Sequence, residues 1–586
     1  IVCYAECPSA SIERFRMIAS PEARRTALER SHPQWRAMTI SAALEAAAAR
    51  HPGRPYVLTK DAFYSYADMR AWARTLASGL IASGVKSGDK VALDMANYPE
   101  FVAVKFAIAM AGATAVPINF LLRGQEIAYV LRQSDSAALV TMDRFRGHNY
   151  LADLDEFAPG WRDGAADALP RLKHVGAFPP GPNASPRTPT LDDLAQRATA
   201  ASDAELERRL AQADPHALSD IIYTSGTTGR SKGVMLTHDM VMRAAFASVY
   251  TRAFEDGRRI LFALPMYHVF GYVECMIAVT FVGGAIIPQA IFEPVEMLDL
   301  AEKHAASEMV CVPMMTHKLI ETAAARGFDS KNFLAMFNSG GANVPSIWGQ
   351  IREVLGAREV LTAYGMTETT ASTTCTLPEG GDEHLLNSNG RFKPAHCAGD
   401  PELSGLTAVY KTIDPETEHD LPVGESGELV VKGPIVTRGY YNKPEETAAA
   451  FTRDGWLRTG DIGRVNADGY LSLTGRLKET YRCGGEMVMP REIEALFDDW
   501  PGVAQVLAVG IPDPKMGEIG VLAVVPIDPA NPPSLDSMLS VCAEKLARFK
   551  VPKHALFLQA SEIPLTVTGR PQKFKLAPIV TQKLSA

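Results

Sequence analysis

Hydrophobic and polar positions along most of the chain follow either a helical or a strand period. Residues 69–80 place apolar side chains three and four positions apart, as an amphipathic helix does, and a Ser-x-x-Asp capping pattern begins at Ser65. Residues 91–95 and 114–118 are short apolar runs typical of buried strands, and residues 101–110 between them predict another helix. Alternating helices and strands of this kind predict an α/β layered fold.

A loop rich in glycine and hydroxyl side chains follows a predicted strand at residues 219–223. Residues 224–233 read Thr-Ser-Gly-Thr-Thr-Gly-Arg-Ser-Lys-Gly, and Thr237 is placed to cap a helix directly after the loop. Hydroxyls and unhindered backbone N–H groups donate hydrogen bonds to phosphate oxygens, and glycine allows close approach. Because Ser231 stands where the second glycine of a Walker loop would precede Lys232, the pattern predicts a different kind of nucleotide-phosphate loop.

The length of the chain and its overall charge narrow the class of protein. With 586 residues it is too long for one hydrophobic core, so we expect two or more domains. The formal net charge of −8 argues against nonspecific binding of nucleic acid. The most apolar run, residues 273–287, contains Glu274 and is shorter than the ~20 residues that a membrane span needs, so we expect no such span.

Cysteine usage and the N-terminal segment bear on the compartment. The eight cysteines are scattered, without the Cys-x-x-Cys pairs of a zinc site, so reduced thiols in a cytoplasm fit best. Residues 1–38 carry charge and have no signal-peptide apolar core, so we interpret them as a helical or loose extension. Residues 157–189 are rich in Pro, Gly, Asp and Arg and predict a surface excursion. We therefore expect a cytoplasmic protein.

Several motifs in order along the chain resemble one family. The stretch that begins at Tyr223, Tyr-Thr-Ser-Gly-Thr-Thr-Gly-x-x-Lys-Gly, resembles the signature of the acyl-adenylate-forming superfamily, which includes acyl-CoA ligases, peptide-synthetase adenylation domains and luciferases. It is followed by Ala-Tyr-Gly-Met-Thr-Glu-Thr from Ala363, Asp-Gly-Trp-Leu-Arg-Thr-Gly-Asp from Asp454 and Gly-Arg-Leu-Lys from Gly475. The resemblance covers about residues 40–580.

The resemblance implies a two-part, acyl-CoA synthetase-like architecture of the α/β class. A large N-terminal domain of packed α/β subdomains, residues 39–477, binds the nucleotide and the acyl group. A small mobile α+β domain, residues 478–586, is joined to it by a hinge near Lys478, and the extension of residues 1–38 precedes both.

The resemblance also implies roles for single residues around ATP or an acyl-adenylate. Tyr364 stacks on the adenine ring, Thr367 approaches the α-phosphate, and Glu368 holds Mg²⁺ through a hard oxygen ligand. Asp461 accepts hydrogen bonds from both ribose hydroxyls, and Arg476 reaches the ribose or phosphate. The implied catalytic residues are Thr224, Thr228, Lys232, His268, Thr367, Glu368 and Arg570. The implied nucleotide-binding residues are Ser225, Gly226, Thr227, Gly229, Gly341, Ala342, Tyr364, Gly365, Met366, Asp461 and Arg476.

The remaining implied contacts belong to the acyl group and to coenzyme A. The implied acyl-pocket residues are Tyr267, Val269, Phe270, Met314 and Gly340. The implied CoA-binding residues are Cys483, Gly484, Gly485 and Lys550. Because the acyl-pocket residues are mostly apolar, and methionine adapts to irregular shapes, we expect the substrate to be a hydrophobic carboxylic acid. A homodimer is a tendency of the family.

One motif departs from the family pattern. Residues 564–570 read Pro-Leu-Thr-Val-Thr-Gly-Arg, whereas the family has a lysine last, which bridges the substrate carboxylate and the α-phosphate. Arg570 keeps the charge, but its planar fork does not imitate a compact ammonium. Losing one such electrostatic group costs about 10²–10³ in rate, roughly 3–4 kcal/mol. Lys573 and Lys575 lie an odd number of residues away, so on an extended segment they would face the other side.

These observations leave more than one function open. We favour an acyl-CoA ligase that mainly converts a preformed acyl-adenylate to acyl-CoA, with a separate adenylating enzyme supplying the adenylate. The alternatives are a complete two-step ATP-dependent synthetase, an enzyme that loads a carrier protein, and a light-emitting oxygenase of the same fold. A carrier-loading enzyme for amino acids is disfavoured because residues 265–271 lack the aspartate that an amino-acid pocket needs. A catalytically dead binder of acyl-AMP is disfavoured because Glu368, Asp461 and Arg476 are retained.

Overall fold

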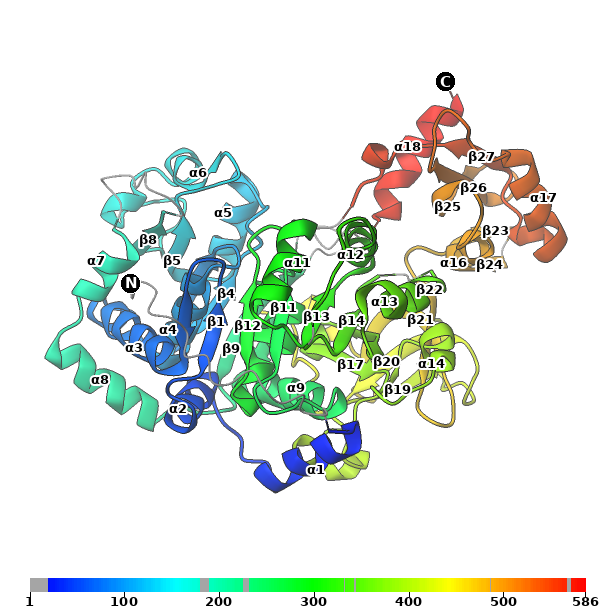
Figure 1. Ribbon diagram of the computed structural model, residues 1–586. Coiled ribbons are helices and arrows are strands. Elements are labelled where there is room, and N and C mark those ends of the chain that lie inside the picture. Colours follow the sequence, from blue (N-terminus) through cyan, green and yellow to red (C-terminus); the bar gives the residue numbers. More distant parts are fainter. Residues whose placement is uncertain are drawn as a thin grey trace.

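The chain forms a large α/β body and a smaller α+β unit that carries the C-terminus. The computed structural model describes residues 19–179, 189–224, 231–330, 332–341, 344–484, 486–565 and 571–585. Figure 1 shows the smaller unit in orange and red at the upper right, beside the larger body in blue, green and yellow. This arrangement confirms the fold class that the sequence predicts.

A six-stranded sheet forms one half of the large body, with the strand order β10-β9-β4-β3-β5-β8. Its strands are β3 (Lys90–Asp94), β4 (Thr114–Pro117), β5 (Ser136–Met142), β8 (His174–Phe178), β9 (Leu218–Thr224) and β10 (Lys232–Thr237). The first five run parallel, and β10 pairs antiparallel with β9. The helices of this half are α2 (Ile40–Arg50), α3 (Tyr66–Ala82), α4 (Pro99–Met110), α5 (Gly124–Gln133), α6 (Tyr150–Phe157), α7 (Leu191–Gln196) and α8 (Ala200–Ala211). The predicted strands 91–95 and 114–118 are confirmed as β3 and β4, and the predicted helices as α3 and α4.

Local signals explain where these helices begin. Ser65 caps α3 through a reciprocal capping box, because its hydroxyl accepts from the Asp68 backbone and the Asp68 carboxylate accepts from the Ser65 backbone. Pro99 occupies the first position of α4, where a missing N–H breaks no helical hydrogen bond.

Two expectations about this sheet are wrong. The loop at 225–231 does not lead directly into a helix, because residues 232–237 pair along their length with β9 and form β10 first. Thr237 does cap the helix that then follows, α9 (His238–Thr251), by accepting from the Met240 backbone at 3.3 Å. The second error is the surface excursion at 157–189, since this segment contains β8, which pairs with β5.

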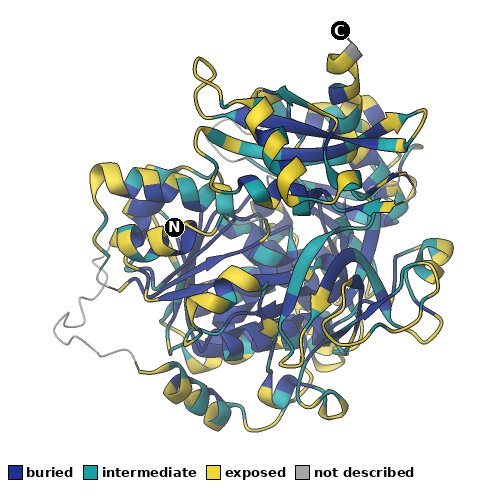
Figure 2. Ribbon diagram, turned by 90° about the vertical axis from the view of Figure 1, so that its right-hand side faces the viewer, coloured by how far each residue is buried: buried dark blue, intermediate teal, exposed yellow. Residues whose placement is uncertain are grey.

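A seven-stranded sheet forms the other half of the large body, with the strand order β15-β14-β13-β11-β12-β1-β2. Its strands are β1 (Pro55–Leu58), β2 (Phe63–Ser65), β11 (Arg259–Phe262), β12 (Ala285–Pro288), β13 (Glu308–Cys311), β14 (Ala335–Asn338) and β15 (Glu359–Leu361). All pairs are parallel except β1 with β2. Its helices include α10 (Val269–Gly271), α11 (Pro294–Lys303), α12 (Pro313–Arg326) and α13 (Ile347–Leu355). Figure 2 shows both sheets in the dark blue of buried residues, with exposed helix faces around them.

Two smaller sheets complete the large body. One consists of β16 (Ala363–Met366), β17 (Ala371–Cys375) and β18 (Arg391–Phe392). The other consists of β19 (Val409–Ile413), β20 (Gly427–Lys432), β21 (Leu457–Val465) and β22 (Leu471–Arg476). The remaining short elements here and in the first half are α14 (Asp382–Asn387), α15 (Pro444–Ala448), β6 (Arg144–Phe145) and β7 (His148–Asn149). Both smaller sheets are antiparallel, and each carries residues of the candidate site.

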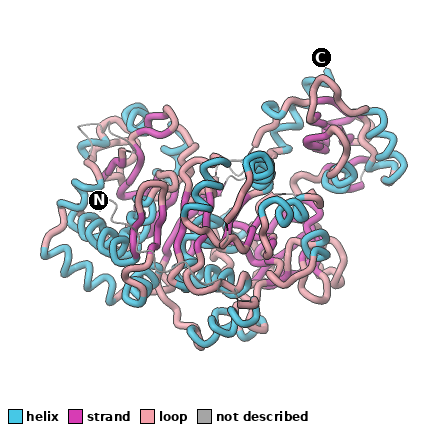
Figure 3. The backbone as a smooth tube through the Cα atoms, in the orientation of Figure 1, coloured by secondary structure: helices cyan, strands magenta, loops and turns pink. Residues whose placement is uncertain are grey.

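The C-terminal unit folds around its own sheet, which Figure 3 shows in magenta between cyan helices. Its strands are β23 (Tyr481–Cys483), β24 (Glu486–Val488), β25 (Val503–Asp513), β26 (Gly517–Pro526) and β27 (His554–Phe557). Its helices are α16 (Pro490–Glu494), α17 (Leu535–Lys545) and α18 (Lys573–Ser585). Successive side chains of a strand point to opposite faces, so Leu507 packs with α18 whereas the adjacent Ala508 belongs to the core under α16 and α17.

The segment before residue 39 is helical in part and docks on the large body. Helix α1 (Pro21–Ser31) buries Arg24, which pairs with the Glu359 carboxylate. Arg25 donates to the backbone carbonyls of Tyr250 and Thr251 at 3.1 Å and 3.0 Å. Residues 21–31 are therefore an anchored part of the large body. In the described part of the chain, no helix combines the length and apolar character that crossing a bilayer requires.

Candidate active site

The carboxyl ends of the two large parallel sheets meet at one place. Asn97, just beyond β3, donates to the backbone carbonyls of Leu264 at 2.8 Å and Gln289 at 3.0 Å. Its side-chain oxygen accepts from the Met266 backbone at 2.8 Å. Leu264 and Gln289 follow β11 and β12, so one asparagine joins the ends of three strands from two sheets. Ligands of open α/β sheets bind at such carboxyl ends.

Three of the residues expected around the nucleoside lie together. Tyr364 donates its hydroxyl to Asp461 Oδ2 at 2.7 Å, and Arg476 Nε lies 2.8 Å from Asp461 Oδ1. Asp461 and Arg476 are direct partners across β21 and β22, while Tyr364 comes from β16 in the other small sheet. Asp461 is buried, whereas the Arg476 side chain is 33% exposed. The structure thus brings together residues separated by about a hundred positions in the sequence.

Glu368 lies in a turn directly after β16 and faces an aromatic ring and cations. Its Oε1 accepts from the Tyr440 hydroxyl at 3.1 Å, and Lys232 Nζ lies 4.0 Å from the centre of the Tyr440 ring. Burial raises the pKa of Glu368, against the opposing effects of the Tyr440 hydrogen bond and of the Lys232 and Arg476 charges. Thr367, the preceding residue, is buried. A carboxylate set among cations and hydroxyls suits a phosphate group and its metal ion.

The donor set around Glu368 fits magnesium that is bound mainly by a substrate. Among the described residues, no group of three or more His, Cys, Asp and Glu side chains gathers to hold a metal. Mg²⁺ in nucleotide enzymes is held by one or two carboxylates together with phosphate oxygens and water. Glu368 supplies one such carboxylate, which is consistent with that kind of site.

Lys232 lies at one end of the predicted phosphate loop, and its charge and that of Arg476 act on Lys478. Thr224 at the end of β9 and Lys232 at the start of β10 are direct partners, so they hold the two ends of the loop together. Burial together with the charges of Lys232 and Arg476 lowers the pKa of Lys478, which places the expected hinge lysine near both. Five of the expected phosphate-loop residues lie outside the described residues: Ser225, Gly226, Thr227, Thr228 and Gly229.

Glycines allow close packing where the expected nucleotide and acyl contacts meet. A Cβ on Gly365 would lie 2.0 Å from the Ala371 carbonyl oxygen, so no side chain fits there between β16 and β17. A Cβ on Gly340 would lie 3.3 Å from Val312 and 3.8 Å from the Phe270 ring, and Gly340 has a positive φ of 88°. Gly341 follows it, and a Cβ on Gly341 would lie 3.3 Å from the Pro313 ring. The expected Met366 is half-buried, and Ala342 lies outside the described residues.

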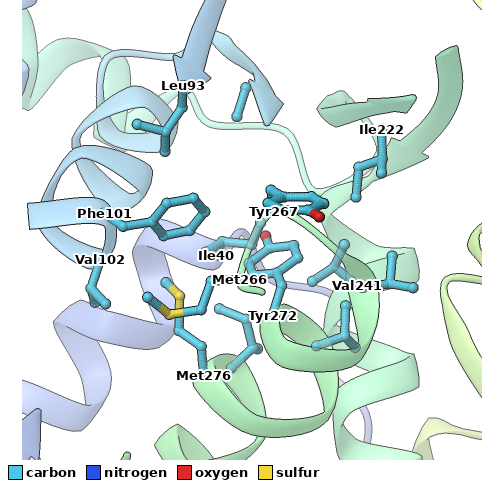
Figure 4. Packing of buried hydrophobic residues seen from close by; sticks show 14 of the residues in the cluster. Ile40, Leu93, Phe101, Val102, Ile222, Val241, Met266, Tyr267, Tyr272 and Met276 are labelled. Carbon is cyan, nitrogen blue, oxygen red and sulfur yellow. The ribbon is translucent and has the colours of Figure 1, made fainter. Parts of the chain in front are cut away.

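The aromatic loop after β11 provides the expected apolar contacts. The Phe270 and Phe337 rings meet edge to face at 5.3 Å, and Tyr267 meets Phe120 in the same way at 5.4 Å. Figure 4 shows Tyr267 among buried apolar side chains from several elements. Val269 is also buried. Met314, by contrast, is 58% exposed on α12 and does not share this packing.

His268 caps the short turn α10. Its Nδ1 accepts from the Phe270 backbone N–H at 3.2 Å, and burial lowers its pKa to about 4. The ring is therefore neutral near pH 7, and the hydrogen bond leaves the Nε2–H as its donor. A neutral donor beside an apolar loop can orient a carboxylate or carbonyl oxygen without adding a charge.

The residues expected to contact CoA make their own contacts inside the small unit. Gly484 has a positive φ of 63° and donates its backbone N–H to the Met516 carbonyl at 2.8 Å. Lys550 pairs with Glu492 at 2.5 Å, and Cys483 is buried. Gly485 lies outside the described residues. The contacts between this unit and the large body include a hydrogen bond from Ser346 to Asp499 at 3.2 Å.

The segment after Arg570 differs from the extended strand on which the sequence argument relied. Arg570 lies outside the described residues, but helix α18 begins at Lys573, so the argument from strand alternation does not apply. Lys573 is instead bound within the small unit, 2.7 Å from Glu494 and 3.6 Å from Glu479. It is therefore engaged in the small unit's own structure.

Sequence reasoning missed Asn97, Tyr440 and Asp94, the last residue of β3. Tyr440 belongs to a Gly-Tyr-Tyr motif, which was a usable signal. Asp94 is a single polar residue within an apolar run and Asn97 follows that run, and only tertiary structure shows the surroundings of each.

Comparisons with known proteins agree with this geometry. The family model "AMP-binding enzyme" matches residues 44–441, and the model "AMP-binding enzyme C-terminal domain" matches residues 492–570. The chain is 32% identical to the long-chain-fatty-acid–CoA ligase FadD13 of Mycobacterium tuberculosis, over 87% of this chain and 92% of the relative. It is 30% identical to the indoleacetate–CoA ligase of Aromatoleum aromaticum, over 93% of this chain and 99% of the relative.

A solved structure with the same fold comes from Rhodopseudomonas palustris. The crystal structure of ATP-bound MatB superposes with a TM-score of 0.77 at 27% sequence identity. The superposition covers 93% of this chain and 100% of the MatB chain. The first family model alone covers more than half of the present chain. These matches confirm the resemblance to the acyl-adenylate-forming superfamily. The chain therefore belongs to the family of AMP-binding enzymes, as an AMP-forming acid–thiol ligase of the acyl-CoA synthetase type.

Proposed function

We propose that this enzyme makes the CoA thioester of a hydrophobic carboxylic acid through an acyl-adenylate, and that it acts mainly in the thioesterification half-reaction. The observation that carries the first part is the grouping of Lys232, Arg476 and Lys478 beside Glu368 and Asp461. This grouping is electropositive and has a carboxylate for the ribose, which is what an adenylate requires.

In the thioesterification step, the CoA thiolate attacks the carbonyl carbon of the acyl–phosphate mixed anhydride. A carbon–sulfur bond forms, the bond from that carbon to the phosphate oxygen breaks, and AMP leaves with the electron pair. We assign stabilisation of the departing phosphate to Lys232, Thr367 and the hydroxyls of Thr224 and Thr228. Glu368 would hold Mg²⁺ with phosphate oxygens, and the ion would neutralise their charge. His268, as a neutral donor, would orient the carbonyl oxygen.

Arg570 supports the second part of the proposal. In this position the family's lysine would bridge the carboxylate and the α-phosphate during adenylation, and a guanidinium cannot take the place of a compact ammonium. The nearby Lys573 is held by Glu494, at 2.7 Å, which argues against its acting as a substitute. A separate adenylating enzyme would then supply the acyl-adenylate, and Cys483, Gly484, Gly485 and Lys550 would contact the incoming CoA.

The apolar contacts of Phe270, Val269 and Gly340 support a hydrophobic acyl group. The names of the two relatives, a long-chain-fatty-acid–CoA ligase and an indoleacetate–CoA ligase, are consistent with this class. They also favour CoA over a carrier protein as the acceptor. The second candidate is a complete two-step synthetase, which the same relatives favour.

Two parallel assays on the purified protein separate these candidates. One supplies ATP, CoA and a panel of hydrophobic acids, and the other supplies chemically made acyl-adenylates and CoA. We expect the second to be faster by about 10²-fold or more, and Arg570→Lys to raise only the first by a similar factor. Arg464→Lys, at an exposed position of β21, is the matched control and should change neither rate.

Any other outcome of these assays would indicate a different function. Similar rates in both assays for the unchanged protein would show a complete synthetase that works with arginine. Thioester formation on a phosphopantetheinyl protein but not on CoA would show a carrier-loading enzyme. No thioester from any acyl-adenylate would leave only a binder of acyl-AMP.

A further inference from the structure

Two buried polar atoms in and beside the aromatic loop after β11 have no hydrogen-bond partner among the residues that the structure describes. They are Oδ1 of Asp94 and the hydroxyl of Tyr267, whose residues are 1% and 6% exposed. The other carboxylate oxygen of Asp94 has only a 3.5 Å contact from the Thr141 hydroxyl. A buried polar atom without a partner costs about 1–3 kcal/mol, so each such atom calls for an explanation.

Both atoms belong to the meeting point of the two parallel sheets. Asp94 is the last residue of β3, and Asn97, three residues later, holds the backbone of Leu264 and Met266 on the other sheet. Tyr267 is the next residue of that loop. Phe120, just beyond β4, packs edge to face on the Tyr267 ring at 5.4 Å. Tyr267 therefore lies where the carboxyl ends of β3, β4 and β11 come together.

The Asp94 carboxyl and the Tyr267 hydroxyl interact electrostatically. Burial raises the pKa of Tyr267, and the Asp94 charge raises it further. Burial raises the pKa of Asp94 to about 7, with the Arg123 charge opposing the increase. Arg123 does not pair with Asp94, because its guanidinium donates to the carbonyls of Phe120 and Leu122 at 2.9 Å and 2.7 Å. The Asp94 carboxyl is thus left for another donor.

A purely structural role does not account for this pair. A buried carboxylate that lacks a hydrogen-bond donor loses favourable interactions with water and gains none from packing. The structural carboxylate Glu274 provides a contrast. Glu274, which is fully buried, accepts from Lys393 at 3.1 Å, Arg252 at 3.3 Å and the Ser372 backbone at 3.0 Å. Asp94 and Tyr267 instead offer one acceptor and one donor to a group that the described part of the chain does not provide.

We propose that Asp94 and Tyr267 form a polar subsite of the acyl pocket, which binds a hydroxyl group carried by the acyl chain. A hydroxyl donates one hydrogen bond and accepts others, so it can donate to Asp94 and accept from Tyr267 at the same time. A ketone has no proton to donate to the ionised Asp94 carboxylate, and an ammonium has no lone pair for the Tyr267 proton. The inference rests on the proposed function and narrows its substrate class to hydroxylated hydrophobic acids.

The test compares acids that differ only in one hydroxyl. Acyl-adenylates of unsubstituted fatty acids and of the same acids with a hydroxyl at successive carbons, beyond those that close a lactone, are supplied with CoA. At one position we expect kcat/KM to exceed that of the unsubstituted acid by about 10- to 100-fold. The ratio should fall to near one in Tyr267→Phe and in Asp94→Leu.

A matched control is available in the small unit. Tyr481 also has a buried hydroxyl without a hydrogen-bond partner, so Tyr481→Phe removes the same atom away from the subsite. This variant should keep the ratio of the unchanged protein. Because a loss of structure would affect both acids of a pair equally, the ratio reports selectivity. If Asp94→Leu does not fold, the ratio in Tyr267→Phe decides the question.

Three results would overturn the subsite. The first is a ratio near one at every hydroxyl position, which would leave a buried water as the occupant of the subsite. The second is a preference that persists in Tyr267→Phe and Asp94→Leu. The third is a stronger preference for the matching amino-substituted acids, which would make the group an ammonium site. Absence of thioester from every acyl-adenylate is a distinct result, because it would overturn the proposed function and the subsite with it.

Discussion

Two clusters of charge lie in the large body, and they differ in how they are paired. The structural charge cluster consists of Arg252, Arg258, Glu274, Glu308 and Lys393, all fully buried. Within it, Arg252 lies 3.3 Å from Glu274 and 2.6 Å from Glu308, and Arg258 lies 3.1 Å from Glu308. Burial acts to raise the pKa of Glu274, but Lys393 and Arg252 outweigh it and hold the pKa below its usual value.

The site charge cluster consists of Lys232, Glu368, Asp461, Arg476 and Lys478. Here Lys232 lies over an aromatic ring rather than beside a carboxylate, Arg476 is partly exposed, and the pKa of Glu368 is raised by burial. In the structural charge cluster every charge is fully buried and lies beside an opposite charge, and such pairs maintain the fold. The site charge cluster has a cation over an aromatic ring and a partly exposed arginine, an arrangement that suits an anionic ligand.

Glu274→Gln should produce the largest effect and should act on stability. The amide removes the carboxylate that pairs with the buried Lys393 and one of the two carboxylates beside Arg252, and breaking such a buried pair typically costs about 3–5 kcal/mol. We expect a marked fall in Tm and in the urea midpoint of the large body. Glu383→Gln, an exposed carboxylate of α14, is the control and should change neither. A loss below about 1 kcal/mol for Glu274→Gln would contradict the structural assignment.

Glu368→Gln should act on activity and not on stability. Removing the carboxylate from the phosphate site should lower the rate of acyl-CoA formation by about 10²–10³-fold. Because burial raises the pKa of Glu368, the folded state disfavours its ionised form, so a neutral amide should not lower Tm. The rate of acyl-CoA formation and Tm are measured on the same preparation of the variant. A fall in Tm like that of Glu274→Gln would erase the distinction between the clusters.

A third buried group, around His238, extends the comparison to pH. His238 lies near the buried Lys105–Asp220 ion pair, and burial lowers its pKa to about 4. In the unfolded chain His238 takes up a proton with a pKa of about 6.5, whereas in the folded chain it does so only near pH 4. The free energy of unfolding therefore decreases as pH falls from about 6.5 to 4. The loss approaches about 3 kcal/mol. His238→Gln should flatten this part of the profile of urea midpoint against pH, and an unchanged slope would show that other groups cause it.

The smallest effect is expected at an exposed pair that bridges the two parts of the chain. Arg482 and Glu416 lie 2.5 Å apart, with side chains 54% and 70% exposed. Exposed pairs contribute about 0–1 kcal/mol, so Glu416→Ala should lower the free energy of unfolding by no more than about 1 kcal/mol and shift Tm only slightly. A shift comparable to that of Glu274→Gln would mean that this contact holds the two parts in place.

Periodicity and local chemistry in the sequence were sufficient for much of the fold. The cap at Ser65 and the first-turn Pro99 act within a few residues, so their helices were predictable. Residues 232–237 and 174–178 were misassigned, because their strands depend on partners across the sheet. A strand edge is completed by residues distant in sequence, which no local pattern records.

The candidate site likewise contains residues that local motifs predict and residues that only the folded chain reveals. Tyr364, Asp461 and Arg476 stand in motifs, and the structure brings them into contact. Asp94 has no motif, since one carboxylate at the end of an apolar strand reads as an ordinary strand end. Its meaning depends on burial and on the lack of a partner, which are properties of the folded chain.

Asn97 limits how this protein can be recombined with its relatives. Its side chain holds Leu264, Met266 and Gln289 through three hydrogen bonds, so segments from different parts of the gene share one junction. A crossover that exchanges β3 and its following loop, but keeps the native residues 264–289, would join two halves that did not evolve together. Libraries that inherit both segments from one parent should therefore contain more folded and active members than libraries that divide them.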